Sequence, residues 1–136
     1  MSTIEKDDNA RMAKIDPNGM EVWKFLLVSH LEGKDCGEAI TQNKPVLRVD
    51  EVNLLRNDDG TETEQSRKLI ERKKKQLTTW KKKDRKAYDI IVKACTENET
   101  AMNVILDKEN RGCSAKKLLG LLDERFDKSD NNQVVQ

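Results

Sequence analysis

Aromatic residues are scarce in this sequence, and that scarcity limits the core that the chain can build. Only 4% of the 136 residues are Phe, Trp or Tyr, whereas 38% are charged. A chain of this length and composition can bury one thin, mostly aliphatic core. We therefore expect a single small domain whose helices have long charged outer faces, with some of the chain disordered.

Histidine and cysteine are also rare, which removes most catalytic and metal-binding chemistry. The only histidine, His30, has no serine, cysteine or aspartate at the spacing of a triad. The three cysteines, Cys36, Cys95 and Cys113, form no C-x-x-C pair, so we expect reduced thiols and neither disulfides nor zinc. The six glycines form no phosphate-binding loop. We predict that the protein is not an enzyme and uses no cofactor, metal or small-molecule substrate.

Long apolar runs are missing as well. No run approaches the ~20 residues of a membrane-spanning helix. The acidic start MSTIEKDDN lacks the features of a signal peptide. We expect a soluble cytoplasmic or nuclear protein that does not contact membranes.

What the sequence does contain is helical periodicity, and the stretch 80–95 carries it most clearly. On a wheel of about 100° per residue, Ala87 and Ile91 fall within about 40° of Trp80. The opposite face is strongly basic, and Asp84 is the one acidic residue on the apolar side. We predict an amphipathic helix that buries Trp80.

Two helices are predicted before residue 41. The first begins near Asn18 or Gly19 and ends at Gly33, and Asp35 caps a short second helix that includes Glu38, Ala39 and Ile40. The apolar stripe of the first helix comprises Trp23, Leu27 and Leu31, widened by Phe25, Leu26 and Val28.

Two more helices are predicted after residue 95. Thr96 and Glu99 have the spacing of a capping box for a short helix, and Ser114 caps the last one. A turn at Gly112 separates them. The apolar stripe of the last helix comprises Ala115, Leu118, Leu119, Leu122 and Phe126.

The resulting domain is an all-α orthogonal bundle of roughly four to six helices over residues 18–128. Residues 1–17 are expected to be a flexible lead. Residues 41–63 are expected to form a mobile connection with one helical turn at 51–55. Residues 129–136 are a polar tail that ends in two valines, as a truncated further element would.

The predicted helix at 80–95 keeps its phase back to Gln65. An unbroken helix from there would be ~46 Å long, whereas a compact domain of this size is roughly 36 Å across. The front half must therefore project, bend at Thr78 and Thr79, or fray. We favour a bend or a frayed front half, because Lys73 and Gln76 give the early turns little apolar surface.

The basic residues are concentrated between 65 and 86. This segment has 11 basic and 2 acidic residues, although the whole chain has a formal charge of only +1. Such a helix face can bind RNA or another polyanion without sequence preference. It can equally be a solvated outer face, and aromatic residues interleaved for base stacking are missing. The candidate contacts are Arg67, Lys68, Arg72, Lys74, Lys75, Lys81, Lys82, Arg85 and Lys86.

Three segments resemble the Gag polyprotein of copia-type LTR retrotransposons. NGMEVWKF (18–25) resembles the family's N-Y-x-x-W-K helix, and WKKKDRKAYDII (80–91) its W-x-x-x-D-x-x-A-x-x-x-I helix. SAKKLLGLLDERF (114–126) is similar to the T/S-A-K-E-x-W-x-x-L-x-x-x-F/Y helix. The C-x2-C-x4-H-x4-C zinc knuckle of longer Gag proteins does not occur here. The chain therefore resembles only the N-terminal capsid region.

The resemblance implies a structural function, namely weak self-association into capsid-like shells, or virus-like particles, that package RNA. It also suggests that the carboxylate of Asp84 accepts a hydrogen bond from a helix N-terminus or an indole and holds two helices in register. The alternative is that Asp84 reaches solvent at the edge of the stripe. A second functional hypothesis is a helical nucleic-acid-binding protein that uses residues 65–86.

Overall fold

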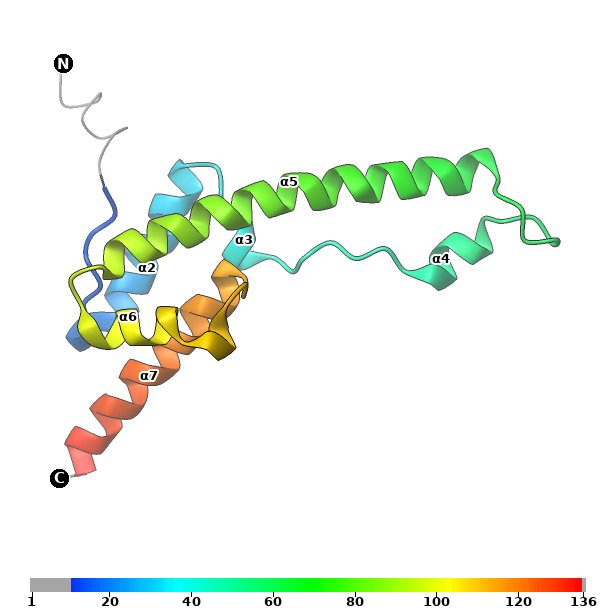
Figure 1. Cartoon of the computed structure of the whole chain (residues 1–136). Coiled ribbons are helices and arrows are strands. Elements are labelled where there is room, and N and C mark those ends of the chain that lie inside the picture. The colour runs from blue at the N-terminus through cyan, green and yellow to red at the C-terminus, as the bar shows by residue number, and fades with distance from the viewer. Residues whose placement is uncertain (1–10, 136) are drawn as a thin grey trace, which may run out of the picture.

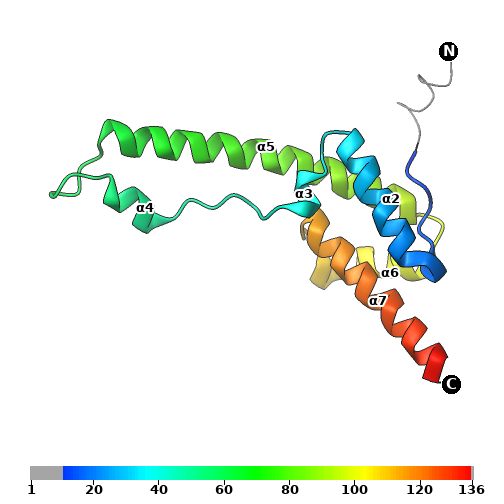
Figure 2. The same ribbon diagram turned by 180° about the vertical axis from the view of Figure 1, so that it is seen from behind.

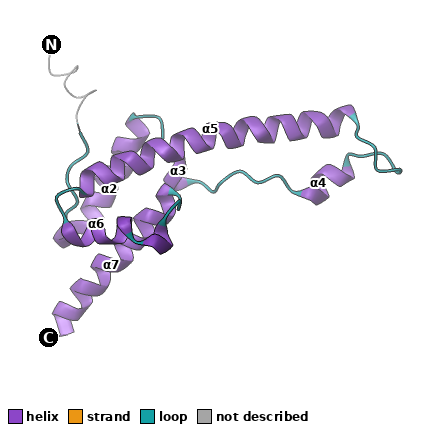
Figure 3. Cartoon of the chain, viewed as in Figure 1, coloured by secondary structure: helices purple, strands orange, loops and turns teal. Residues whose placement is uncertain are grey.

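Helices make up all the regular structure in the computed structural model, which describes the backbone of residues 11–135 and the side chains of 11–126 (Figure 3). Within these residues there is no strand, which confirms the predicted all-α class. The α-helices are α2 (Met20–Gly33), α3 (Glu38–Thr41), α4 (Val49–Leu54), α5 (Glu64–Cys95), α6 (Glu99–Leu106) and α7 (Ala115–Val135). Two 3-10 turns, η1 (Pro17–Gly19) and η2 (Lys108–Asn110), precede α2 and α7.

The core lies where α3, α6 and α7 pack against the C-terminal half of α5 and α2 packs against α3 and α7 (Figure 1). The predicted stripe of α2 is buried there, and so are the residues that follow Trp80 on the apolar side of α5. We call this part of the molecule the body. Its largest contributions come from Trp23, Leu27, Leu31, Ala87, Ile91, Leu118, Leu122 and Phe126.

Helix α5 is continuous over 32 residues, so the predicted bend or frayed front half is wrong. At about 1.5 Å per residue it is ~48 Å long. Both views show its N-terminal half projecting from the body, with the chain from α3 through α4 running outward alongside it to the tip (Figures 1 and 2). We call this projection the arm. Long-chain Lys, Arg, Glu and Gln residues favour helix, and Thr63 and Ser66 form a capping box at its start.

The tip of the arm has a small set of buried contacts of its own. Val52 from α4 is buried, as are Ser66 and Leu69 in the first turns of α5. The Thr63 hydroxyl donates a hydrogen bond to the carbonyl of Leu55. Helix α4 covers most of the predicted helical turn at 51–55. The early turns of α5 therefore have a packing partner that the sequence analysis did not anticipate.

The turn between α2 and α3 differs from the prediction. Helix α2 ends at Gly33 as predicted, but the left-handed residue after it is Asp35, with φ of 60°. The amide of Cys36 donates to the carbonyl of Leu31 at 2.9 Å, as in a Schellman motif. Asp35 therefore ends α2 and does not cap α3. The N-cap of α3 is Gly37, which has no side chain that could cap the helix.

Gly37 is required by a close approach of two backbones. A Cβ added there would lie 3.2 Å from the amide nitrogen of Glu32 and 2.7 Å from its Cγ. Any side chain here would force Glu32 or the start of α3 to shift, and glycine avoids this.

The predicted cap of α6 is also wrong, whereas that of α7 is confirmed. The side chain of Asn98 accepts the amide of Ala101 at 2.9 Å, and Thr96 donates its hydroxyl to Lys93 instead. Ser114 accepts the amide of Lys117 at 3.1 Å, as predicted.

The predictions of a flexible lead at 1–17 and a polar tail at 129–136 both differ from the structure where it describes these residues. Ile15 is buried and donates its amide to the carbonyl of Ala94 at 2.9 Å, and the indole of Trp23 donates to the carbonyl of Ala13 at 2.9 Å. The expected lead is therefore part of the body from about residue 12, and residues 1–10 lie outside the described part. The backbone of α7 continues through most of the predicted tail to Val135, because no Pro or Gly interrupts it after Gly120. Gln136 lies outside the described residues.

Candidate functional site

The basic residues singled out in the sequence all lie on α5, and all are exposed. Four of them share the side of the helix opposite Trp80, within about 80° of one another at 100° per residue. We call Arg67, Lys74, Lys82 and Arg85 the outer row. Three more face residues 42–45, and we call Lys68, Arg72 and Lys75 the groove row. The exposed Lys81 belongs to neither row.

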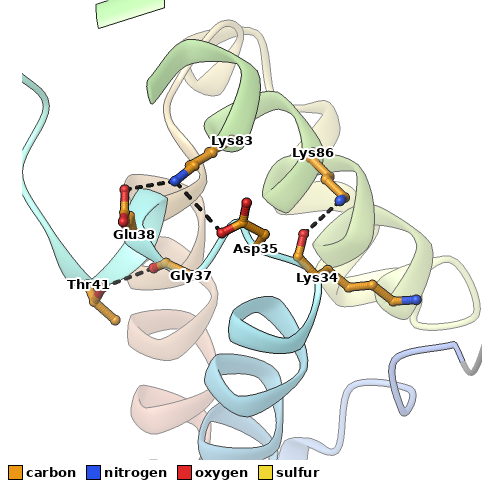
Figure 4. Close-up of polar contacts among 7 residues, drawn as sticks. All are labelled: Lys34, Asp35, Gly37, Glu38, Thr41, Lys83 and Lys86. Carbon is orange, nitrogen blue, oxygen red and sulfur yellow. Dashed lines mark hydrogen bonds and ion pairs between the residues drawn. The ribbon is translucent and has the colours of Figure 1, made fainter. Parts of the chain in front are cut away.

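Lys83 and Lys86 of α5 make polar contacts with the turn between α2 and α3 (Figure 4). The ammonium of Lys83 lies 3.0 Å from the carboxylate of Glu38 and 3.9 Å from that of Asp35. The hydrogen bond with Glu38 is the main cause that raises the pKa of Lys83. Both contacts join α5 to residues that follow the end of α2.

Lys86 donates to the carbonyl of Lys34 at 2.7 Å, at the C-terminal end of α2 (Figure 4). A cation is favoured there because the last carbonyls of a helix carry partial negative charge. The sequence predicts a nucleic-acid contact at Lys86. In the structure, however, the ammonium of Lys86 is hydrogen-bonded to the carbonyl of Lys34.

Asp84 caps the N-terminus of α7. Its half-buried carboxylate accepts a hydrogen bond from the amide of Ala115 at 2.7 Å. This confirms the expected hydrogen bond to a helix N-terminus and excludes the alternative that the carboxylate only reaches solvent. The same bond ties the middle of α5 to the start of α7.

Most of the core residues predicted from the apolar stripes are buried. Trp23, Leu27, Leu31, Ala87 and Ile91 are buried. Trp80 is also buried, but it lies beside the main core cluster. In α7 the buried motif residues are Ala115, Leu118, Leu122 and Phe126.

A groove of about 670 Å³ lies between α5 and residues 42–45. The groove row lines one wall, and Gln42, Asn43 and Pro45 line the other. Trp80 also lines it, is only 9% exposed, and its indole N–H has no hydrogen-bond partner among the described residues. The sequence does not predict this groove, because it forms between residues 42–45 and part of α5, which are distant along the chain.

The outer side of α2 carries an exposed apolar surface. Val22 is 65% exposed, Phe25 72% and Leu26 45%, and we call these residues the α2 patch. The sequence predicts Phe25 and Leu26 at the margin of the buried stripe, whereas both are exposed. The structure buries only the opposite side of the helix, so α2 is apolar on two sides.

The histidine and the three cysteines have pKa values that are shifted mainly by burial. Cys36 and Cys95 are buried, Cys113 is half-buried, and burial raises the pKa of each thiol, that of Cys95 to about 12. Burial and the nearby Lys34 lower the pKa of His30. Within the described residues, no group of three His, Cys, Asp or Glu side chains could hold a metal ion.

Comparisons with protein-family models, curated proteins and solved structures found no match. The resemblance to copia-type Gag therefore stays a prediction from the sequence. Among the helices of the described residues, none has both the length and the apolar composition that crossing a bilayer requires.

Proposed function

We propose that this chain is a self-associating assembly module, of the kind that the resemblance to copia-type Gag implies. The observation that supports it is the α2 patch. Isolated exposed apolar side chains are common on proteins, but a helix that is apolar on two sides usually packs on two sides. The body covers only the side with Trp23, Leu27 and Leu31.

A second copy of the chain suits the α2 patch. Phe25 lies three residues after Val22 and Leu26 four, so their side chains share one face across adjacent turns. Two such helices can pack about a two-fold axis, with each Phe25 against the Val22 and Leu26 of the other copy. Because the patch is small, we expect a weak, concentration-dependent contact.

Sedimentation velocity over a range of concentrations tests this proposal. The wild type should show a sedimentation coefficient that rises with concentration, and Phe25→Ser with Leu26→Ser should keep it at the monomer value. The control changes two exposed leucines elsewhere, Leu54→Ser with Leu106→Ser, and should leave association intact. A wild type that stays monomeric, or equal loss in both double variants, would contradict the proposal.

RNA binding by the outer row is the second candidate function. Its residues extend over about 27 Å of a projecting helix, at 1.5 Å per residue. No ion pair links them to other described residues. Glu71 and Asp89 are the acidic residues on the same face.

The test measures the binding of an oligouridine by fluorescence anisotropy as salt is raised. Lys74→Gln with Lys82→Gln and Arg85→Gln should weaken binding. It should also lower the slope of log affinity against log salt by about 2, because each single-strand phosphate contact contributes about 0.7. Lys83 is left unchanged because it supports the body. The control is Lys108→Gln with Arg111→Gln and Lys117→Gln, and an equal effect there would contradict a site on α5.

A further inference from the structure

We infer that the groove between α5 and residues 42–45 binds an extended peptide that carries carboxylates at alternate positions. This inference depends neither on the α2 patch nor on RNA binding by the outer row. It rests on the charges of the groove row, the free backbone of the opposite wall and the buried indole of Trp80.

The groove row supplies cations at a useful spacing. Arg72 lies four residues after Lys68, and Lys75 three residues after that, which places them about 6 Å and 4.5 Å apart along the axis. Side chains on one side of an extended peptide recur about every 6.6 Å. Among the described residues, only Lys68 of the three has an ion pair, with Glu64 at 3.5 Å. Arg72 and Lys75 therefore have no ion-pair partner among the described residues. Because side chains three residues apart on a helix have Cβ atoms about 5–6 Å apart, these two cations can reach carboxylates on alternate residues of a peptide.

The opposite wall supplies a backbone that can pair with an extended chain. Residues 43–47 form no backbone hydrogen bond with any other described residue. Extended peptides commonly bind by pairing along such a free edge, while side chains on one face give specificity. Pro45 removes one donor from this edge, which leaves the other amides and all the carbonyls.

Trp80 supplies a buried donor without an acceptor. Its indole nitrogen is inaccessible and makes no hydrogen bond within the described residues, although the ring lines the groove. Buried N–H groups in folded proteins nearly always have a partner. A carbonyl or carboxylate of a bound peptide would provide one after a small movement of the ring.

The acidic side chains of the groove favour a peptide over a nucleic acid strand. Glu71 lines the same wall as the groove row, and Glu38 lies nearby in its ion pair with Lys83. A phosphodiester chain carries a charge at every unit and would be repelled at Glu71. A peptide can place a neutral residue there and still present carboxylates to Arg72 and Lys75.

The experiment measures the binding of a fluorescein-labelled TETETETE peptide to the full chain by fluorescence anisotropy at about 0.15 M salt, where the Debye length is about 8 Å. Lys68→Gln with Arg72→Gln and Lys75→Gln should weaken binding by more than about tenfold, because charge-assisted hydrogen bonds are lost. The charge-matched control, Lys74→Gln with Lys82→Gln and Arg85→Gln, should change it by less than about twofold, because exposed charges beyond the groove are screened. A TTTTEEEE peptide should bind more weakly than the alternating one.

Trp80→Phe tests the indole N–H while keeping an aromatic ring. It should weaken peptide binding in a variant whose circular dichroism shows it to be folded. If that variant does not fold, the inference is still tested by comparing the triple variant of the groove row with the control triple variant at Lys74, Lys82 and Arg85. Equal loss in both triples, no binding by the wild type, or tighter groove-dependent binding of an octauridine would overturn the inference.

Discussion

Asp84 connects two helices through a single side chain. Its carboxylate accepts the amide of Ala115 at 2.7 Å, so a residue on α5 satisfies the N-terminus of α7. The first amides of a helix have no partner within the helix, and losing such a cap typically costs about 0.5–2 kcal/mol.

We therefore predict that Asp84→Ala lowers the free energy of unfolding by about 1–2 kcal/mol. Thermal unfolding followed by circular dichroism should show a lower Tm. Asp84→Asn, which keeps an acceptor oxygen, should lose less, and Asp89→Ala on the exposed side of α5 should lose almost nothing. An unchanged Tm for Asp84→Ala would refute a role in helix register.

The buried thiol of Cys95 makes the free energy of unfolding depend on pH in the alkaline range. Burial raises the pKa of its thiol from 9.0 to about 12, so the unfolded chain loses this proton at lower pH than the folded protein. The stability that the neutral thiol contributes is complete below pH 9 and is lost as pH rises towards 12. We predict that Cys95→Ala, although less stable at neutral pH, loses stability less steeply between pH 9 and 11. Urea unfolding at several pH values measures this, and parallel slopes would contradict it.

At the residue level, most residues of the buried stripes were predictable, and so was the Ser114 cap, whereas two of the other caps were not. Ala87, Ile91 and Leu118 followed from helical periodicity, which reports directly on burial. Thr96 and Asp35 were assigned as caps from local patterns, yet nearby residues compete for the same amides. The side chain of Asn98 accepts a hydrogen bond from the amide of Ala101. Asp35 has a left-handed backbone conformation that ends α2. The choice between such neighbours depends on tertiary packing, which periodicity does not report.

Helix α5 divides into two halves with different surroundings. The half after Trp80 lies in the main core, whereas the half before it packs only at its first turns, against α4. The sequence analysis expected a bend because Lys73 and Gln76 offer little apolar surface. Helix propensity and the Thr63 cap were sufficient to keep the helix continuous, because a started helix gains one hydrogen bond per added residue.

We predict that the two halves differ in hydrogen exchange. Amides in residues 68–79 should exchange faster than those in residues 84–95, because local opening costs less where few apolar contacts break. Exchange followed by NMR resolves individual amides. Equal protection along α5 would mean that the arm is as well packed as the body.

The whole molecule consists of a compact body and an arm that projects from it (Figures 1 and 2). The all-α class and the core were predictable because they depend on local periodicity. The groove and the α2 patch were not, since they depend on where distant segments lie relative to one another. Both proposed surfaces on the arm, the outer row and the groove, exist only if α5 is straight.

The separation between Arg67 and Lys93, two exposed positions near opposite ends of α5, tests that requirement most directly. Double electron–electron resonance with spin labels on Arg67→Cys and Lys93→Cys measures it, in a chain with Cys113→Ser. The buried thiols of Cys36 and Cys95 should stay unlabelled. A continuous helix predicts a narrow distribution centred near about 39 Å, because 26 residues rise by 1.5 Å each. A broad distribution, or one centred well below about 30 Å, would mean that the helix bends or frays. The arm and both of its proposed surfaces would then be refuted.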